Sequence, residues 1–138
     1  MYRVGREETE AFARSLLSRD FFKINGGGRE VYRFEEEWKA FTGAQYALTM
    51  TSGFAALTSA LIGMGIGPGD EVIVPAYTYI ASALAVTAVG AIPVIAEADE
   101  CLTLDPADTE KKMSAHTKAV MPVHIQGFPA DLDALKAL

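Results

Sequence analysis

The sequence has one cysteine, no basic stripe and no long apolar run, and each absence argues against a class of protein. Cys101 has no second thiol for an internal disulfide or a metal site, so we expect a free thiol. Twelve basic against eighteen acidic residues give a net charge of -6, which argues against a nucleic-acid partner. Apolar stretches break well before the roughly 20 residues of a membrane span, and the N-terminal stretch lacks the apolar centre of a signal peptide. We therefore expect a cytoplasmic protein that does not enter a membrane.

The composition itself is that of a globular domain. The chain has 138 residues, of which 50% are hydrophobic and 22% charged, and this balance excludes intrinsic disorder. A chain of this length fits one domain and buries a real core.

The N-terminal part, residues 1–43, is expected to be a helical arm with a glycine-rich loop. Apolar residues at helical spacing predict an amphipathic helix over 6–18 and a second helix that ends at Gly43, with Glu35 and Lys39 as an i,i+4 ion pair. Between them, Gly26–Gly28 predicts a mobile loop, because ordering three glycines costs much backbone entropy.

Residues 44–138 alternate strand-like and helix-like runs. The expected strands are 46–50, 71–75, 92–96 and 118–123, and the expected helices are 54–64, 79–89, 106–113 and one from Asp131. The strands have continuous hydrophobicity, as in parallel strands covered on both faces by crossover helices. The sequence therefore predicts an α/β fold with a mostly parallel sheet and flanking helices.

Two patterns that resemble sites have plainer explanations. The glycines of residues 63–69 mimic a dinucleotide fingerprint, but they follow a helix and precede a strand, which is the reverse of the required order. We interpret them as a helix end and a turn around Pro68 and Gly69. The acids of residues 97–108 lie in and beside a loop without a histidine, so we expect a solvated edge and no metal site.

Ligands of parallel α/β sheets bind beyond the carboxyl ends of the strands, and three corners there carry polar or aromatic residues. In the first, the amides of Gly53, Phe54 and Ala55 open a helix beside Thr51 and Ser52. These amides form a phosphate seat to which Ser52 or Thr51 adds a hydroxyl, or else Ser52 or Thr51 merely caps the helix. The second corner carries Tyr79, which is either a ring that stacks on a ligand or a core residue. The third corner carries His124 and Gln126, which are either neighbours of the site or structural residues.

Taken together, residues 34–99 and 119–135 resemble the pyridoxal-phosphate-dependent sugar aminotransferases of the DegT/StrS group. The order and spacing of the three corners carry the resemblance. It implies the N-terminal part of the large domain of an aspartate-aminotransferase-like fold, so residues 44–138 are expected to be a truncated cofactor domain. Family members run to several hundred residues, so we expect the chain to be an N-terminal fragment.

The resemblance also implies roles for individual residues. Gly53 and Phe54 hold the phosphate of pyridoxal 5'-phosphate through backbone amides, Ser52 adds a hydroxyl, and Tyr79 stacks on the pyridine ring. Phe54 departs from the family, which commonly has threonine there, so one hydroxyl is missing. Gly26–Gly28 is a substrate-side element by the same resemblance, or else a linker.

The implied reaction transfers an amino group from glutamate or glutamine to a keto-sugar nucleotide, in a homodimer when full length. The lysine that forms the Schiff base is expected beyond Leu138, so no catalytic residue is assigned within the chain, which alone is expected to be inactive. None of its own lysines matches that motif, at positions 23, 39, 111, 112, 118 and 136. Two alternatives stay open, namely a sugar dehydratase of the same family and a non-catalytic remnant or interaction module.

Overall fold

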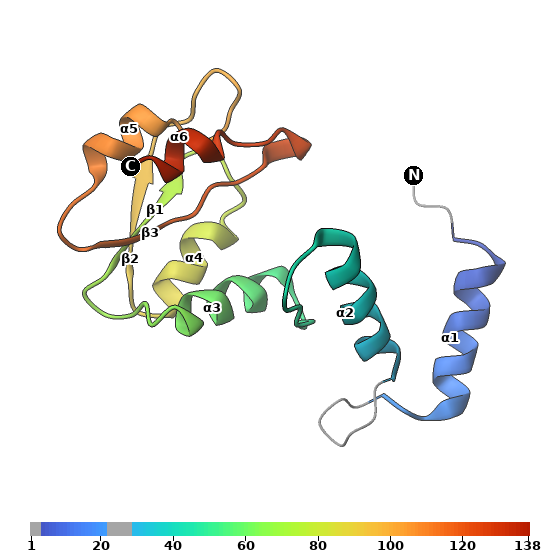
Figure 1. Ribbon diagram of the computed structural model, residues 1–138. Coiled ribbons are helices and arrows are strands. Elements are labelled where there is room, and N and C mark those ends of the chain that lie inside the picture. The colour runs from blue at the N-terminus through green and yellow to red at the C-terminus, as the bar shows by residue number, and fades with distance from the viewer. Residues whose placement is uncertain (1–3, 22–28) are drawn as a thin grey trace. The chain divides into compact units, whose positions relative to one another are not determined.

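A computed structural model describes residues 4–21 and 29–138 (Figure 1). The chain divides into two compact units, Met1–Thr49 and Met50–Leu138, and each is described here by itself. The loop predicted at Gly26–Gly28 lies outside the described residues. Among the described helices, none combines the length and the apolar character needed to cross a membrane.

The first unit contains helices α1 (Arg6–Ser18) and α2 (Arg29–Thr42). The Gly5 amide donates to the Glu8 carboxylate at 2.7 Å, which satisfies one of the free amides at the start of α1. This bond lowers the pKa of Glu8 below its ordinary value. Helix α2 ends as predicted at Gly43, which has a φ of +72° and donates to the Lys39 carbonyl at 2.8 Å.

The predicted ion pair between Glu35 and Lys39 is wrong. Lys39 pairs with Glu36 at 2.7 Å, one residue further along the helix. The Glu35 side chain lies on the buried side of α2, where it is 6% exposed and accepts a hydrogen bond from the Thr49 amide at 2.8 Å. A buried carboxylate needs such a donor, and Thr49 supplies it from the segment that follows the helix.

The strand predicted at 46–50 is also absent from the structure, which gives residues 46–50 no regular secondary structure. A strand is defined by a ladder of hydrogen bonds, and no strand of the described chain pairs with this segment. Tyr46 and Leu48 are 80% and 65% exposed, so the apolar residues of the segment are not covered as those of a central strand would be. The pattern carried no information on a pairing partner.

The second unit contains three parallel strands in the order β2-β1-β3, namely β1 (Glu71–Pro75), β2 (Ile92–Ala96) and β3 (Thr117–Val120). These match three of the predicted strands, and β3 ends early because Pro122 has no amide to continue the ladder. The turn predicted before β1 is present, with Gly69 at a φ of +91° and the Gly67 amide donating to Asp70 at 3.0 Å.

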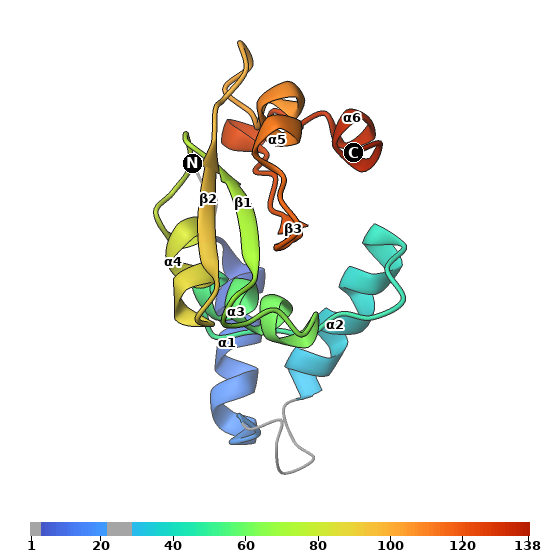
Figure 2. The same ribbon diagram turned by 90° about the vertical axis from the view of Figure 1, so that its left-hand side faces the viewer.

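Helices cover both faces of the sheet, so the α/β fold is confirmed. One core cluster joins Val72 and Val74 to α3 (Gly53–Gly63) and α4 (Ala81–Ala88). A second cluster contains Ile73 on the opposite face, toward α5 (Pro106–Lys112) and α6 (Leu132–Lys136). Figure 2 shows α4 and α5 on opposite sides of β1 and β2. Successive buried residues of β1 thus face opposite layers, and the sheet lies between two layers of helices.

The acidic residues that follow β2 hold the loop itself. Asp99 accepts hydrogen bonds from the amides of Cys101 and Thr103, both at 2.9 Å. Asp105 caps α5 by accepting from the Ala107 amide at 2.9 Å. No group of three or more metal-ligating side chains occurs within the described ranges.

Asp108 gives this loop a pH-dependent contact. Its carboxylate accepts from the Glu97 amide at 2.7 Å and from Lys112 Nζ at 3.0 Å, and the amide is the larger cause of a pKa below the ordinary 3.8. Because the folded-state pKa is depressed, the stabilisation is fully present above the ordinary value and is lost as the pH falls through the folded value. The Glu97 amide resonance, followed by NMR from about pH 6 to about pH 2, is expected to titrate with a midpoint below 3.8.

Asp108→Asn is the matched control, since the amide side chain keeps the size and loses the titration. A midpoint at or above 3.8 in the unmodified chain would contradict the contact.

Candidate functional site

The three predicted corners line one cavity of about 940 Å³ in the second unit. The cavity lies beside the start of α3 and beyond the carboxyl ends of β1 and β3, where parallel sheets bind ligands. Its volume falls within the range of cofactor sites. Of the residues named from the sequence for these corners, six line the cavity and Ala55 does not: Ser52, Gly53, Phe54, Tyr79, His124 and Gln126.

The start of α3 presents two open amides. Ser52 is extended (φ -162°, ψ 163°), and its Oγ accepts from the Ala55 amide at 3.1 Å. The prediction that Ala55 donates to a ligand is therefore wrong, because Ser52 already uses that amide. The amides of Gly53 and Phe54 have no partner among residues 4–21 and 29–138. Ser52 accepts through a lone pair, so its hydroxyl proton stays available as a donor.

Gly53 leaves open space where a side chain would stand. A Cβ built on Gly53 meets no atom within 4 Å, and its φ lies outside the left-handed region. The bare fold therefore has no need of glycine at this position. The two amides, the Ser52 hydroxyl and the positive end of the helix dipole together form a donor set suited to a phosphate.

Tyr79 stands on the cavity wall with 78% of its surface exposed, so it is not a core residue. Its backbone carbonyl accepts from the Ser82 amide at 3.0 Å. The hydroxyls of Thr78 and Ser82 lie 2.9 Å apart and join the residue before Tyr79 to the first turn of α4. Sequence reasoning missed this pair, although a threonine and a serine four residues apart at a helix start are a readable signal.

Phe54 extends the aromatic lining. Its side chain is 41% exposed and shares the cavity with Tyr79. A phenyl ring stands in place of the hydroxyl that the resemblance implies, so the group that Phe54 could offer to a phosphate is its backbone amide.

His124 and Gln126 follow β3 on the third side of the cavity. His124 Nδ1 accepts a hydrogen bond from the Ala130 amide at 3.0 Å. Gln126 lies in the left-handed region with φ 52° and ψ 20°, and Gly127 follows with φ 87°. These two residues turn the chain back, which brings Ala130 to the histidine.

No lysine, aspartate or glutamate is among the described residues that line the cavity. Lys112, the last residue of α5, pairs with Asp108 and donates to the Ile95 carbonyl at 2.8 Å. The described residues that line the cavity thus offer donors for a phosphate and an aromatic face for a ring, and no lysine that could react with a carbonyl is among them.

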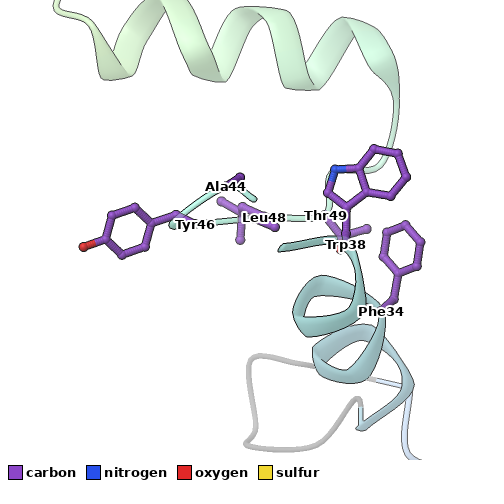
Figure 3. A pocket seen from close by; sticks show the side chains of 7 residues that line it. Phe34, Trp38, Ala44, Tyr46, Leu48 and Thr49 are labelled. Carbon is purple, nitrogen blue, oxygen red and sulfur yellow. The ribbon is translucent and has the colours of Figure 1, made fainter. Parts of the chain in front are cut away.

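A second hollow lies in the first unit and measures about 170 Å³. Figure 3 shows Phe34 and Trp38 side by side there, while Tyr46 points away from them. The rings of Phe34 and Trp38 stack with centroids 5.9 Å apart. This hollow is well below the usual size of a cofactor site, and it holds no charged side chain.

The chain is similar in sequence and in structure to known transaminases. The chain is 47% identical to dTDP-3-amino-3,4,6-trideoxy-alpha-D-glucose transaminase of Streptomyces venezuelae over 138 residues, which is 99% of this chain and 36% of the relative. The crystal structure of 3-amino-5-hydroxybenzoic acid synthase superposes with a TM-score of 0.93 at 40% identity and covers 98% of this chain and 35% of its own.

A third relative is the putative sugar aminotransferase Spr1654 of Streptococcus pneumoniae in its PLP-form. It superposes with a TM-score of 0.78 at 34% identity, over 80% of this chain and 28% of its own. This chain therefore spans about a third of the length of the relatives it matches. The model of the DegT/DnrJ/EryC1/StrS aminotransferase family matches residues 4–138, and the chain belongs to that family.

Proposed function

We propose that this chain supplies the phosphate seat and the ring-stacking face of a pyridoxal-phosphate-dependent aminotransferase that acts on a keto-sugar nucleotide. The observation that carries the proposal is the pair of open amides at Gly53 and Phe54 in the same cavity as the exposed ring of Tyr79. The amino donor is glutamate or glutamine, and the homodimer and the cytoplasmic location expected from the sequence belong to the same proposal.

The residues present fit such a cofactor. Two amides, one hydroxyl and a helix dipole match a phosphate, and a tyrosine whose ring is free matches a flat heterocycle. When bound, pyridoxal phosphate supplies an electron sink for the transfer of the amino group. The chain itself orients that group: the start of α3 fixes the phosphate, and Tyr79 restricts the tilt of the ring. The apolar side chains of Leu57, Met121 and Val123 exclude water from the cavity wall.

The binding half of the proposal is tested on the chain itself with pyridoxamine 5'-phosphate, which lacks the aldehyde that reacts indiscriminately with lysines. Equilibrium dialysis is expected to show saturable binding of pyridoxamine phosphate and much weaker binding of pyridoxamine, because the phosphate meets the α3 amides. Equal affinity for the two compounds would contradict the phosphate seat.

The catalytic half is tested on the product of the complete reading frame that contains this sequence. With pyridoxal phosphate, glutamate and a keto-sugar nucleotide, we expect an aminated sugar nucleotide and stoichiometric 2-oxoglutarate by mass spectrometry. A dehydrated sugar without amination would assign the protein to the dehydratase branch. If neither product forms, the non-catalytic interpretation is the one that remains.

A further inference from the structure

His124 is held in one orientation by a backbone amide. Its Nδ1 accepts from the Ala130 amide at 3.0 Å, and Ala130 is buried. The position of Ala130 is fixed in turn by α6, because its carbonyl accepts from the Leu132 amide at 2.8 Å and Asp131 caps that helix through the Ala134 amide at 2.9 Å. The imidazole is therefore attached to a rigid element.

This hydrogen bond determines where the imidazole carries its proton. A ring nitrogen that accepts from an N–H must present a lone pair, so Nδ1 is unprotonated. A neutral imidazole then carries its one proton on Nε2.

The Nε2–H group is a donor without a partner in the described part of the chain, and its residue lines the cavity. It stands at the corner after β3, whereas the phosphate donors stand at the start of α3. A ligand whose phosphate occupies the α3 corner thus presents a different part of itself to His124.

We infer that His124 is a fixed-tautomer hydrogen-bond donor of the cavity, and that its Nε2–H binds an oxygen of the pyridoxal-phosphate-class ligand other than those of the phosphate. This inference rests on the proposed function. The Ala130 amide sets the tautomer. The chain turns back at Gln126 and Gly127, both in the left-handed region, and this turn brings the Ala130 amide within hydrogen-bond distance of His124. His124 is a binding residue here, and Ala130 positions it.

The tautomer is tested directly by long-range ¹H–¹⁵N NMR of the imidazole nitrogens at neutral pH. The chain has two histidines, and His116→Asn assigns the signals of His124. We expect an unprotonated Nδ1 and a protonated Nε2. The opposite tautomer, or a mixture of both, would overturn the inference.

The ligand contact is tested with two variants, one that keeps only the acceptor at the place of Nδ1 and one that keeps only the donor at the place of Nε2. The amide of His124→Asn reaches the place of Nδ1 and keeps the acceptor for Ala130, but loses the donor at the place of Nε2. The amide of His124→Gln reaches the place of Nε2, keeps that donor and loses the contact with Ala130. His116→Asn, outside the cavity, is the matched control.

We expect His124→Asn to weaken pyridoxamine phosphate binding about threefold to tenfold, as the loss of one neutral hydrogen bond does, with Tm unchanged. His124→Gln is expected to bind more tightly than His124→Asn and to have the lower Tm. Inorganic phosphate, probed by ³¹P NMR, is expected to bind all forms equally. Unchanged binding in His124→Asn beside a binding wild type would overturn the role of His124 alone, whereas a wild type that binds no pyridoxamine phosphate would overturn the proposed function.

Discussion

Gly53→Pro is expected to weaken the binding of pyridoxamine phosphate by about tenfold to a hundredfold without lowering the stability of the fold. Proline removes the Gly53 amide, which is one of two amides without a partner in the described chain, on residues that line the cavity. A hydrogen bond to a charged group contributes about 1.5–3 kcal/mol, and each 1.4 kcal/mol is about a tenfold change in Kd.

The fold is expected to accept proline here for three reasons. Gly53 is the first residue of α3, the position that proline favours. The preceding residue, Ser52, has the extended backbone that a residue before proline requires. No described atom lies within 4 Å of a Cβ at Gly53, and the lost amide has no partner in the described chain. Proline at a compatible site raises the free energy of unfolding by about 0.4–1 kcal/mol.

Gly53→Ala isolates the amide from the change of side chain. It adds a Cβ but keeps the N–H, so we expect it to bind markedly better than Gly53→Pro. The measurements are equilibrium dialysis with pyridoxamine phosphate and thermal unfolding by circular dichroism. If Gly53→Pro binds as tightly as the wild type, the α3 amides are not the phosphate seat.

Local sequence signals predicted those features whose cause is local. Glycine in the left-handed region ended α2, and Pro68 and Gly69 formed a turn. Continuous apolar runs predicted β1, β2 and β3, because a strand covered on both faces has no polar side. The place of the cavity followed from topology, since the carboxyl ends of parallel strands meet at one edge.

Features that depend on distant partners were not readable. The strand expected at 46–50 has no ladder of hydrogen bonds in the described chain. The sequence predicted a surface ion pair between Glu35 and Lys39, whereas Glu35 accepts a hydrogen bond from the Thr49 amide. The bond from Ala130 to His124 spans six residues and requires two consecutive left-handed residues, which glycine predicts at only one position. The sequence left open whether Ser52 caps α3, and the structure shows that it does, through the Ala55 amide.

Tyr79→Ala is expected to weaken pyridoxamine phosphate binding roughly 20-fold. A stacked aromatic pair adds about 0.5–1.5 kcal/mol beyond area burial, and roughly 50 Å² of covered ring face adds about 1 kcal/mol at ~25 cal/mol per Å². Because 78% of Tyr79 is exposed, its removal is expected to change the free energy of unfolding by less than about 0.5 kcal/mol. Like Gly53→Pro, Tyr79→Ala is thus expected to lower the affinity without a comparable loss of stability, but it acts through a side chain and not through a backbone amide.

Two further variants identify the ring as the cause. Tyr79→Phe keeps the aromatic face and loses only the hydroxyl, so near wild-type affinity is expected. Tyr46→Ala removes an equally exposed tyrosine, 80% accessible, from the first unit and is expected to leave affinity unchanged. Since inorganic phosphate has no ring, its binding is expected to be insensitive to Tyr79→Ala, whereas Gly53→Pro weakens it. Parallel loss of inorganic phosphate binding in Tyr79→Ala would show that the substitution disturbs the start of α3, and stacking would no longer explain the result.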